Sequence, residues 1–288
     1  MIDRTERRVD LHTHTTASDG TLTPGELVSL ARDTGLGAVA ITDHDSVAGL
    51  EEGLAAGEAL GVRVIPGVEI SSSEEGCEIH IVGLFLRRGC GELLDFLAER
   101  KKERVRRNQR LLDRLREIGM PLSPEEITPG AGGLLTRTHV AEAMARRGWA
   151  ATPVEALERY LIPGKPGWVE KNTPPPKVCA EIIHRAGGLA FLAHLDRIHK
   201  GDTAHSLSIA RRVLTQAGLD GLEARYATYS PQWEQTADRL AEEMGLLRSG
   251  GSDFHGARKP NQLGTGLGGL FVPESWVEKI EAFLQHLR

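Results

Sequence analysis

The sequence predicts an α/β fold, either a barrel or a doubly wound sheet, that is interrupted by a helical insertion. Short and almost continuously apolar runs alternate with helical patterns, which is typical of parallel strands covered on both faces. From about residue 92 to residue 163 the pattern is helical only. Strands are expected at residues 9–11, 38–42, 62–70, 79–86, 189–193, 221–224 and 247–249.

Capping signals place the first helix and the return from the insertion. Thr23-Pro24-Gly25-Glu26 predicts a capping box with Pro at the first helical position, and Gly35 predicts the end of that helix. Thr173-Pro174-Pro175-Pro176 predicts the start of the next helix of the α/β part. We therefore expect residues 1–91 and 164–288 to form one α/β domain, with residues 92–163 inserted into it.

The insertion is expected to hold three helices. An apolar stripe at helical spacing predicts one long helix over residues 92–118, and two more are expected near 138–147 and 153–160. Ser123-Pro124-Glu125-Glu126 predicts a second capping box between the first two. Residues 100–116 are rich in Lys and Arg, but acidic residues are interleaved, so a solvated helix face is expected rather than a polyanion-binding surface.

Composition indicates an ordinary globular chain. It has 288 residues and a formal net charge of -5, which argues against a generally basic nucleic-acid binder but not against a local basic patch. A chain of this length buries roughly 75% of its unfolded surface, so it needs no disulfides. Three cysteines exclude a disulfide scaffold and predict a reducing, cytoplasmic setting. Without an apolar run of about 18 residues or a secretory signal, neither a membrane span nor secretion is expected.

Histidines and carboxylates gather where the expected strands end. His12-Thr13-His14 follows the first strand, and residues two apart on a strand point to the same face, so both rings can reach one metal. The candidate ligands are His12, His14, Asp19, His44, Glu69, His80, His194, Asp253 and His255. In α/β barrels the C-terminal ends of the strands carry the active site.

Taken singly, each candidate has a simpler explanation. Glu69 could cap a helix, and His80 could be a packed core histidine. Nine unpaired polar side chains buried on one face would, however, cost several kcal/mol each without a compensating cation. Nitrogen and oxygen ligands without thiolates suit Zn, Mn or Fe, and nine ligands exceed what one tetrahedral metal needs. Two or three metals that share ligands are expected.

The order of these motifs resembles that of the polymerase and histidinol phosphatase (PHP) family. The corresponding segments are His12-Thr13-His14, Ser18-Asp19-Gly20, Thr42-Asp43-His44, Gly67-Val68-Glu69, His80, Ala193-His194 and Asp253-Phe254-His255. The resemblance covers nearly the whole chain. The helical insertion is similar to that of the bacterial branch that includes nucleotide phosphatases and short-RNA 5′ exonucleases. Leu195 and Thr138 stand where the family usually has Pro, and neither departure removes a ligand.

The resemblance implies a distorted (β/α)7-type PHP barrel with a helical insertion domain and a trinuclear metal site. The first metal would be held by His12, His14, Glu69 and Asp253. The second would be held by His80, His194 and a bridging Glu69. The third would be held by Asp19, His44 and His255.

The expected chemistry is phosphate ester hydrolysis. We hypothesise that a metal-bridging hydroxide, held by Glu69, Asp253 and His194, attacks phosphorus in line with the leaving oxygen. Substrate phosphate would be bound by Arg137, Arg197 and Lys165, since guanidinium offers bidentate geometry. Asp43 and Asp45, which flank His44, are expected either to orient its ring or to stabilise the turn that they belong to.

The predicted function is a metal-dependent phosphoesterase with two or three divalent ions (Mn, Fe or Zn). Its substrate would be a nucleotide, such as a 3′,5′-bisphosphonucleotide or a nucleoside monophosphate, or short 5′-phosphorylated RNA. Neither a membrane nor an obligate protein partner is indicated. Two alternatives remain: an amidohydrolase-like C–N hydrolase and a non-catalytic PHP scaffold. The sequence leaves the native metal, the choice between mononucleotide and oligonucleotide, and the oligomeric state open.

Overall fold

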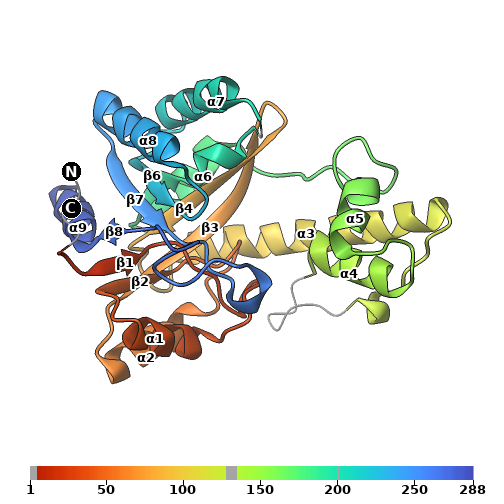
Figure 1. The fold of residues 1–288 in the computed structure, drawn as a ribbon, viewed down its shortest axis with the longest axis horizontal. Coiled ribbons are helices and arrows are strands. Elements are labelled where there is room, and N and C mark those ends of the chain that lie inside the picture. Colours follow the sequence, from red (N-terminus) through yellow and green to blue (C-terminus); the bar gives the residue numbers. More distant parts are fainter. Residues whose placement is uncertain (1–4, 128–134, 200, 288) are drawn as a thin grey trace. The chain divides into compact units, whose positions relative to one another are not determined.

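A computed structural model describes residues 5–127, 135–199 and 201–287 (Figure 1). The chain divides into two compact units, one formed by Met1–Asp95 and Thr173–Arg288 and the other by Phe96–Asn172. The first unit holds the sheet and the second is helical. The domain boundaries expected at residues 91 and 163 stay predictions. No described helix is long and apolar enough to cross a bilayer.

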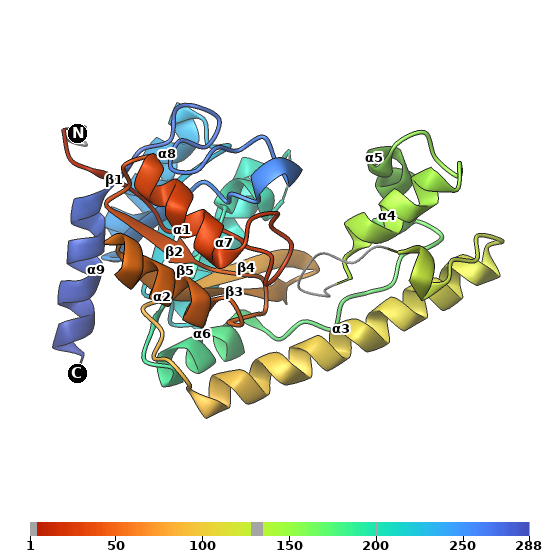
Figure 2. The same ribbon diagram turned by 90° about the horizontal axis from the view of Figure 1, so that it is seen from below.

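The first unit alternates strands with helices, as the sequence predicts. All seven predicted strands are present, and an eighth, two residues long, follows them. The elements are β1 (Arg8–Asp10), α1 (Pro24–Asp33), β2 (Ala38–Ile41), α2 (Leu50–Leu60), β3 (Val64–Glu74), β4 (Cys77–Leu84), α6 (Pro176–Arg185), β5 (Leu189–Leu192), α7 (Thr203–Gln216), β6 (Gly221–Tyr226), α8 (Pro231–Met244), β7 (Leu247–Gly251), β8 (Val272–Pro273) and α9 (Glu274–His286). Figures 1 and 2 show α1, α2, α6, α8 and α9 packed around the outside of the strands.

The strands pair in the order β7-β6-β5-β4-β3-β2-β1-β8. The expectation of a parallel sheet is correct for β1–β3 and β5–β7 and wrong for β4, which runs antiparallel to both of its neighbours. The short β8, which was not predicted, runs antiparallel to β1. Glu75 and Gly76 join β3 to β4 with φ values of 48° and 76°. Two central residues with positive φ form the tight loop of a hairpin, which leaves no room for a crossover helix.

The barrel closes where β7 returns to β1. Leu11 N donates to Gly250 O at 3.0 Å, Asp253 N donates to His12 O at 2.9 Å, and His14 N donates to Phe254 O at 2.9 Å. The distorted barrel expected from the sequence is therefore confirmed. The buried Asp10 carboxylate reinforces the closure by accepting hydrogen bonds from Ser252 N, Ser252 Oγ and Gly264 N.

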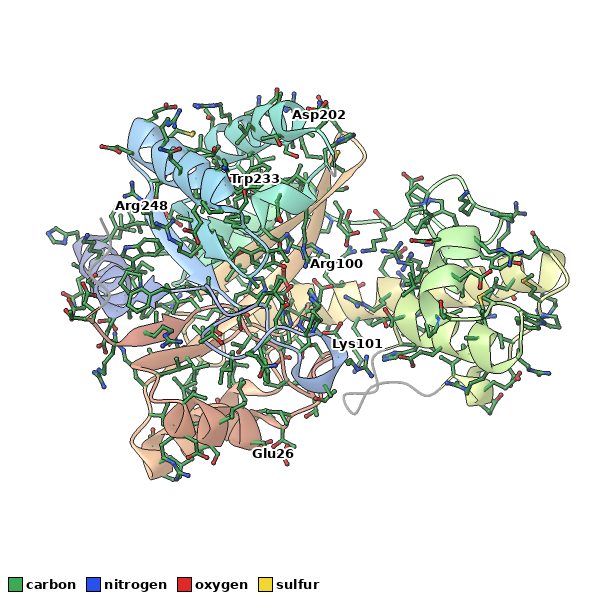
Figure 3. The ribbon with its side chains drawn as sticks, viewed as in Figure 1. Glu26, Arg100, Lys101, Asp202, Trp233 and Arg248 are labelled. Atoms are coloured by element: carbon green, nitrogen blue, oxygen red, sulfur yellow. The ribbon has the colours of Figure 1, made fainter. Side chains whose placement is uncertain are left out.

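Local sequence explains how α1 begins. Glu26 N donates to Thr23 Oγ1 at 3.2 Å, and Thr23 N donates to the Glu26 carboxylate at 2.8 Å; Figure 3 labels Glu26. The predicted capping box is thus confirmed. Leu27 and Val28 of the same helix are buried in a core cluster that includes Ile41 of β2.

The second unit is built along α3 (Gly91–Glu117), which begins in the first unit. This long helix is followed by α4 (Arg137–Arg146) and α5 (Pro153–Ala156), so the three predicted helices are present. Their apolar faces enclose a separate core around Leu111, Leu115 and Met144.

Three arginines of α3 hold the segment that leaves the second unit. Arg100 donates to Asn172 O, Arg107 Nε donates to Val169 O at 3.2 Å, and Arg114 Nε donates to Pro166 O at 2.8 Å. Seven helical residues rise about 10 Å, and three extended residues span about 10 Å, so the arginines and carbonyls stay in register. The three arginines that bond to backbone carbonyls therefore have a structural role. Arg106 and Arg110, in contrast, form the solvated ion pairs expected of this helix.

Replacing Arg107 by Ala should lower the free energy of unfolding by roughly 2 kcal/mol, because Arg107 is buried, bonds to Val169 O and stacks on Trp168. Urea denaturation followed by circular dichroism measures this change. Arg106→Ala is the matched control, since the Arg106 side chain is 63% exposed and its partner Glu103 lies 3.5 Å away. Equal effects of the two substitutions would contradict the structural role of Arg107.

Candidate metal centre

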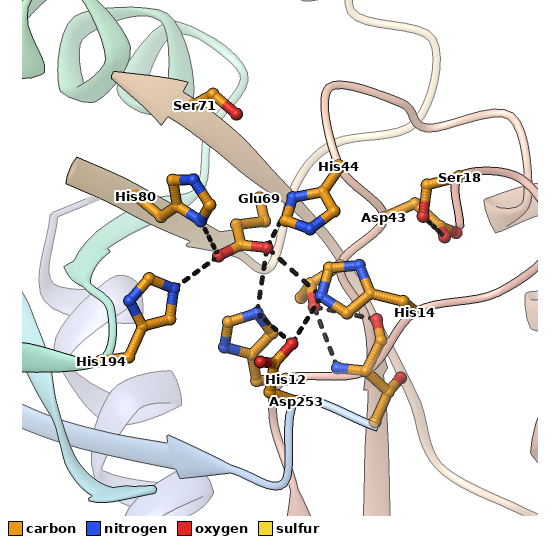
Figure 4. Close-up of polar contacts among 12 residues, drawn as sticks. His12, His14, Ser18, Asp43, His44, Glu69, Ser71, His80, His194 and Asp253 are labelled. Atoms are coloured by element: carbon orange, nitrogen blue, oxygen red, sulfur yellow. Dashed lines mark hydrogen bonds and ion pairs between the residues drawn. The ribbon is translucent and has the colours of Figure 1, made fainter. Parts of the chain in front are cut away.

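The structure brings all nine predicted ligands together within the first unit. Figure 4 shows the buried Glu69 carboxylate with the candidate ligands that surround it: His12, His14, His44, His80, His194 and Asp253. Five histidine nitrogens lie within 3.2 Å of the two oxygens of Glu69. Near Oε2 lie His12 Nε2 (3.2 Å), His14 Nε2 (3.2 Å) and His44 Nδ1 (2.8 Å). Near Oε1 lie His80 Nδ1 (2.7 Å) and His194 Nε2 (3.1 Å). Glu69 thus separates two groups of imidazoles.

Asp253 faces the first of these groups from the end of β7. Its Oδ1 lies 3.2 Å from His14 Nε2 and 3.9 Å from His12 Nε2. Its Oδ2 points elsewhere and accepts hydrogen bonds from Tyr226 Oη and Lys259 Nζ, both at 2.7 Å. Oδ1 of Asp253 therefore faces the histidines, whereas Oδ2 is held by hydrogen bonds from Tyr226 and Lys259.

A third group forms around Asp19. Its Oδ1 lies 3.3 Å from His255 Nε2, and the ring centroids of His255 and His14 are 4.0 Å apart. Ligand atoms of His14, Asp19, His44 and His255 all lie within 4.8 Å of one another. Asp43 holds the loop that carries Asp19 by accepting hydrogen bonds from Thr15 N, Thr15 Oγ1 and Ser18 Oγ.

Several atoms in these groups are buried but make no hydrogen bond with any described residue. They are His12 Nε2, both ring nitrogens of His14, His44 Nδ1, Glu69 Oε2 and Asp19 Oδ1. Leaving such atoms unpaired is costly, and all of them are good ligands for a divalent cation of borderline hardness. The residues present therefore fit the metals that the sequence predicts.

His12, His14 and His80 hold protons tightly when no cation is bound, whereas burial lowers the pKa of His194. Burial by itself would lower the pKa of His14, but the carboxylates of Asp253 and Glu69, each 3.2 Å from Nε2, raise it to about 9. Burial also opposes protonation of His80, yet the charge of Glu69 raises its pKa to about 9. Burial opposes protonation of His12 as well, but the charges of Glu69 and Glu223 raise its pKa well above the ordinary value. These protons balance the buried carboxylates.

The third group behaves differently. Burial lowers the pKa of His255 to about 4, and the neighbouring His14 pushes it in the same direction. Burial alone would raise the pKa of Asp19, but His44 and His255 hold it far below its ordinary value. This group therefore keeps an ionised carboxylate beside a neutral imidazole, which is a ready pair of metal ligands.

His80 corrects one sequence-based expectation. The candidate ligands were expected at or near the C-terminal ends of parallel strands, but β4 is antiparallel and His80 lies in its first half, opposite Ser71 of β3. Directly opposite residues of an antiparallel pair share a face, and so do residues two apart on one strand. His80 therefore joins Glu69 on the same face of the hairpin.

The sequence analysis missed three residues that support the site. Glu223 Oε1 lies 2.8 Å from His12 Nδ1, while Tyr226 and Lys259 bond to Asp253. The one signal available was an acidic residue inside the otherwise apolar run of residues 221–224, all of which is buried. Asp43 and Asp45 bond to loop and backbone groups, Asp45 accepting from Ser71 N, which favours the turn role for both.

The predicted substrate contacts lie in different units. Arg197 is at the site, with Nη1 3.7 Å from Asp253 Oδ2 and its guanidinium over the Tyr226 ring. Arg137 and Lys165 belong to the second unit. There Arg137 stacks on Trp168, and Lys165 is exposed.

Comparison with known proteins agrees with these features. The family model described as PHP domain matches residues 10–120. A 5′-3′ exoribonuclease of Haemophilus influenzae is 35% identical over 250 residues, which is 86% of this chain and 90% of that protein. This chain belongs to the PHP family. It is accordingly a metal-dependent phosphoesterase.

Other PHP proteins share the whole architecture. A 3′,5′-nucleoside bisphosphate phosphatase of Chromobacterium violaceum is 32% identical over 258 residues, which is 86% of this chain and 87% of that protein. A crystal structure from Bifidobacterium adolescentis, described as a metal-dependent phosphoesterase, has a TM-score of 0.81 at 28% identity and covers 96% of each chain. The PHP fold of this chain, insertion included, thus has a close counterpart in that structure.

Metal binding at pH 7 should release protons, because His14 and His80 have pKa values of about 9 and must lose their protons to become ligands. Apparent affinity should therefore fall as the pH falls below about 9, and the release should vanish above it. Calorimetric titration with zinc in two buffers of different ionisation enthalpy counts these protons. Equal heats in both buffers at pH 7 would contradict the assignment.

Proposed function

We propose that this chain hydrolyses phosphate esters of nucleotides or of the 5′ end of short RNA, using two or three divalent ions held by the nine side chains. One observation carries the proposal: the buried Glu69 carboxylate lies between two groups of imidazoles, with unpaired ligand atoms facing one another. A carboxylate so placed can be shared by neighbouring ions, as in other multi-metal phosphoesterases.

We assign the ligands by the groups around Glu69. His12, His14, Asp253 and Glu69 Oε2 would hold one ion, and His80, His194 and Glu69 Oε1 a second. Asp19, His44 and His255 would hold the third. When bound, divalent ions supply Lewis acidity toward a phosphoryl oxygen and lower the pKa of water to near neutrality. The nitrogen and oxygen ligands are compatible with Mn, Fe or Zn.

Residues of the chain itself orient these ligands and meet the substrate. Tyr226 and Lys259 fix Oδ2 of Asp253, so that Oδ1 keeps facing His12 and His14. The side chains of Arg197 and Lys259 are 37% and 29% exposed, so these two cations line the accessible side of the site. We infer that they bind the phosphoryl oxygens that do not react, Arg197 with bidentate geometry.

The second unit would supply further contacts to the substrate. Arg137 is held by stacking on Trp168 and by a hydrogen bond to Leu161 O, so its guanidinium is preorganised. Lys165 is exposed in the segment that follows the third helix. We propose both residues as ligands for phosphate groups remote from the reacting one.

The relatives support the substrate class. One is named for exonucleolytic attack on RNA from the 5′ end and another for removal of a phosphate from a nucleoside bisphosphate. Both substrates carry a phosphate ester on a nucleotide, together with at least one further phosphate for Arg197 and Lys259. We also propose a cytoplasmic location, which is supported by three free cysteines.

Manganese-reconstituted protein should release phosphate or nucleotides from at least one of 3′,5′-bisphosphonucleotide, AMP and short 5′-phosphorylated RNA. Asp253→Ala should reduce this activity more than roughly a hundredfold, because it removes a ligand rather than a group behind one. Asp238→Asn is the control, since Asp238 pairs with Arg225 and Arg248 instead of the ligands. Hydrolysis of cyclic amides alone would favour the amidohydrolase alternative and contradict the proposal.

A further inference from the structure

We propose that Glu223 is a positioning residue that fixes two of the assigned metal ligands at once, the ring of His12 and the backbone of His194. The inference rests on the metal ligation assigned above. Glu223 lies on β6 and is 1% exposed. Each of its carboxylate oxygens is used by a different ligand residue, and the two ligands belong to different groups around Glu69.

The first contact sets the orientation of His12. Glu223 Oε1 lies 2.8 Å from His12 Nδ1. In the proposed arrangement Nδ1–H donates to this carboxylate oxygen, which leaves the lone pair of the neutral ring on Nε2. The other ring nitrogen, Nε2, is buried without a hydrogen bond and lies 3.2 Å from Glu69 Oε2. Glu223 therefore turns the lone pair of Nε2 toward the metal position.

The second contact stabilises an unusual backbone. His194 has φ 28° and ψ 69°, a backbone conformation that is unfavourable for a non-glycine residue. Its N–H donates to Glu223 Oε2 at 2.7 Å, and the next residue, Leu195, donates its N–H to Tyr229 Oη at 2.7 Å. This turn places His194 Nε2 at 3.1 Å from Glu69 Oε1.

The rings of His12 and His194 lie side by side as a result. Their centroids are 6.0 Å apart and their planes differ by 24°. Each ring presents Nε2 to a different oxygen of Glu69. One buried carboxylate, which contacts the ring of His12 and the backbone of His194, thus sets the spacing of ligands for two neighbouring metal positions.

Glu223→Gln tests this role because it keeps the shape of the side chain but leaves a single acceptor oxygen. Either His12 Nδ1–H or His194 N–H then loses its acceptor, so zinc affinity should fall roughly tenfold to a hundredfold. Competition with a chromophoric chelator measures the affinity, and circular dichroism checks the fold. Asp238→Asn, which alters a carboxylate that pairs with Arg225 and Arg248 and with none of these ligands, should retain wild-type zinc affinity.

Wild-type zinc affinity in Glu223→Gln, with only a lower melting temperature, would show a purely structural role and overturn the proposal. Should that variant not fold, long-range ¹⁵N–¹H correlation of the zinc-loaded wild type decides the matter. The proposal requires a proton on His12 Nδ1 and zinc on Nε2, and the reverse arrangement overturns it. Both readouts are independent of turnover, so a failure to hydrolyse phosphate esters would contradict the proposed function alone.

Discussion

The arrangement of the site depends on one buried charge, the Glu69 carboxylate. A carboxylate at this depth is stable only with compensating positive charge, and five imidazole nitrogens surround it within 3.2 Å. Without cations the compensation comes from protons on the histidines, which is why the pKa of His80 rises to about 9. The same groups are ready to exchange those protons for divalent ions.

The hydrogen bonds that close the barrel also position residues of the site. The backbone bonds that join β7 to β1 involve His12, His14 and Asp253, so the ligands are placed by the hydrogen bonds that complete the fold. Two of the candidate ligands, His194 and Asp253, have positive φ values of 28° and 51°. Strained backbone persists where the surroundings hold it firmly, and here buried carboxylates and closing strands do so.

Sequence reasoning predicted the nine candidate ligands that the structure brings together, because each lies in a short motif beside a strand and strand ends meet on one face of a barrel. It missed the hairpin direction of β4, because Glu75-Gly76 is a weaker turn signal than Asn-Gly. Glu223, Tyr226 and Lys259 were missed for another reason. Their roles depend on which strands become neighbours, and no local pattern reveals that.

The arginines of α3 likewise show that a local pattern does not reveal which distant segment a side chain contacts. Local charge pattern correctly predicts solvated ion pairs for Arg106 and Arg110. It does not separate them from Arg100, Arg107 and Arg114, whose partners are carbonyl groups more than 50 residues further along the chain. Spacing of seven residues on a helix becomes meaningful only when an extended segment lies along that helix.

Anomalous diffraction from crystals grown with manganese tests the central claim, that Glu69 is shared between metal ions, most directly. We expect one peak bounded by His12, His14 and Asp253 and another bounded by His80 and His194, each contacting a different oxygen of Glu69. A third peak is expected beside Asp19, His44 and His255. Manganese bound away from Glu69, or a single ion that uses only one of its oxygens, would contradict the account.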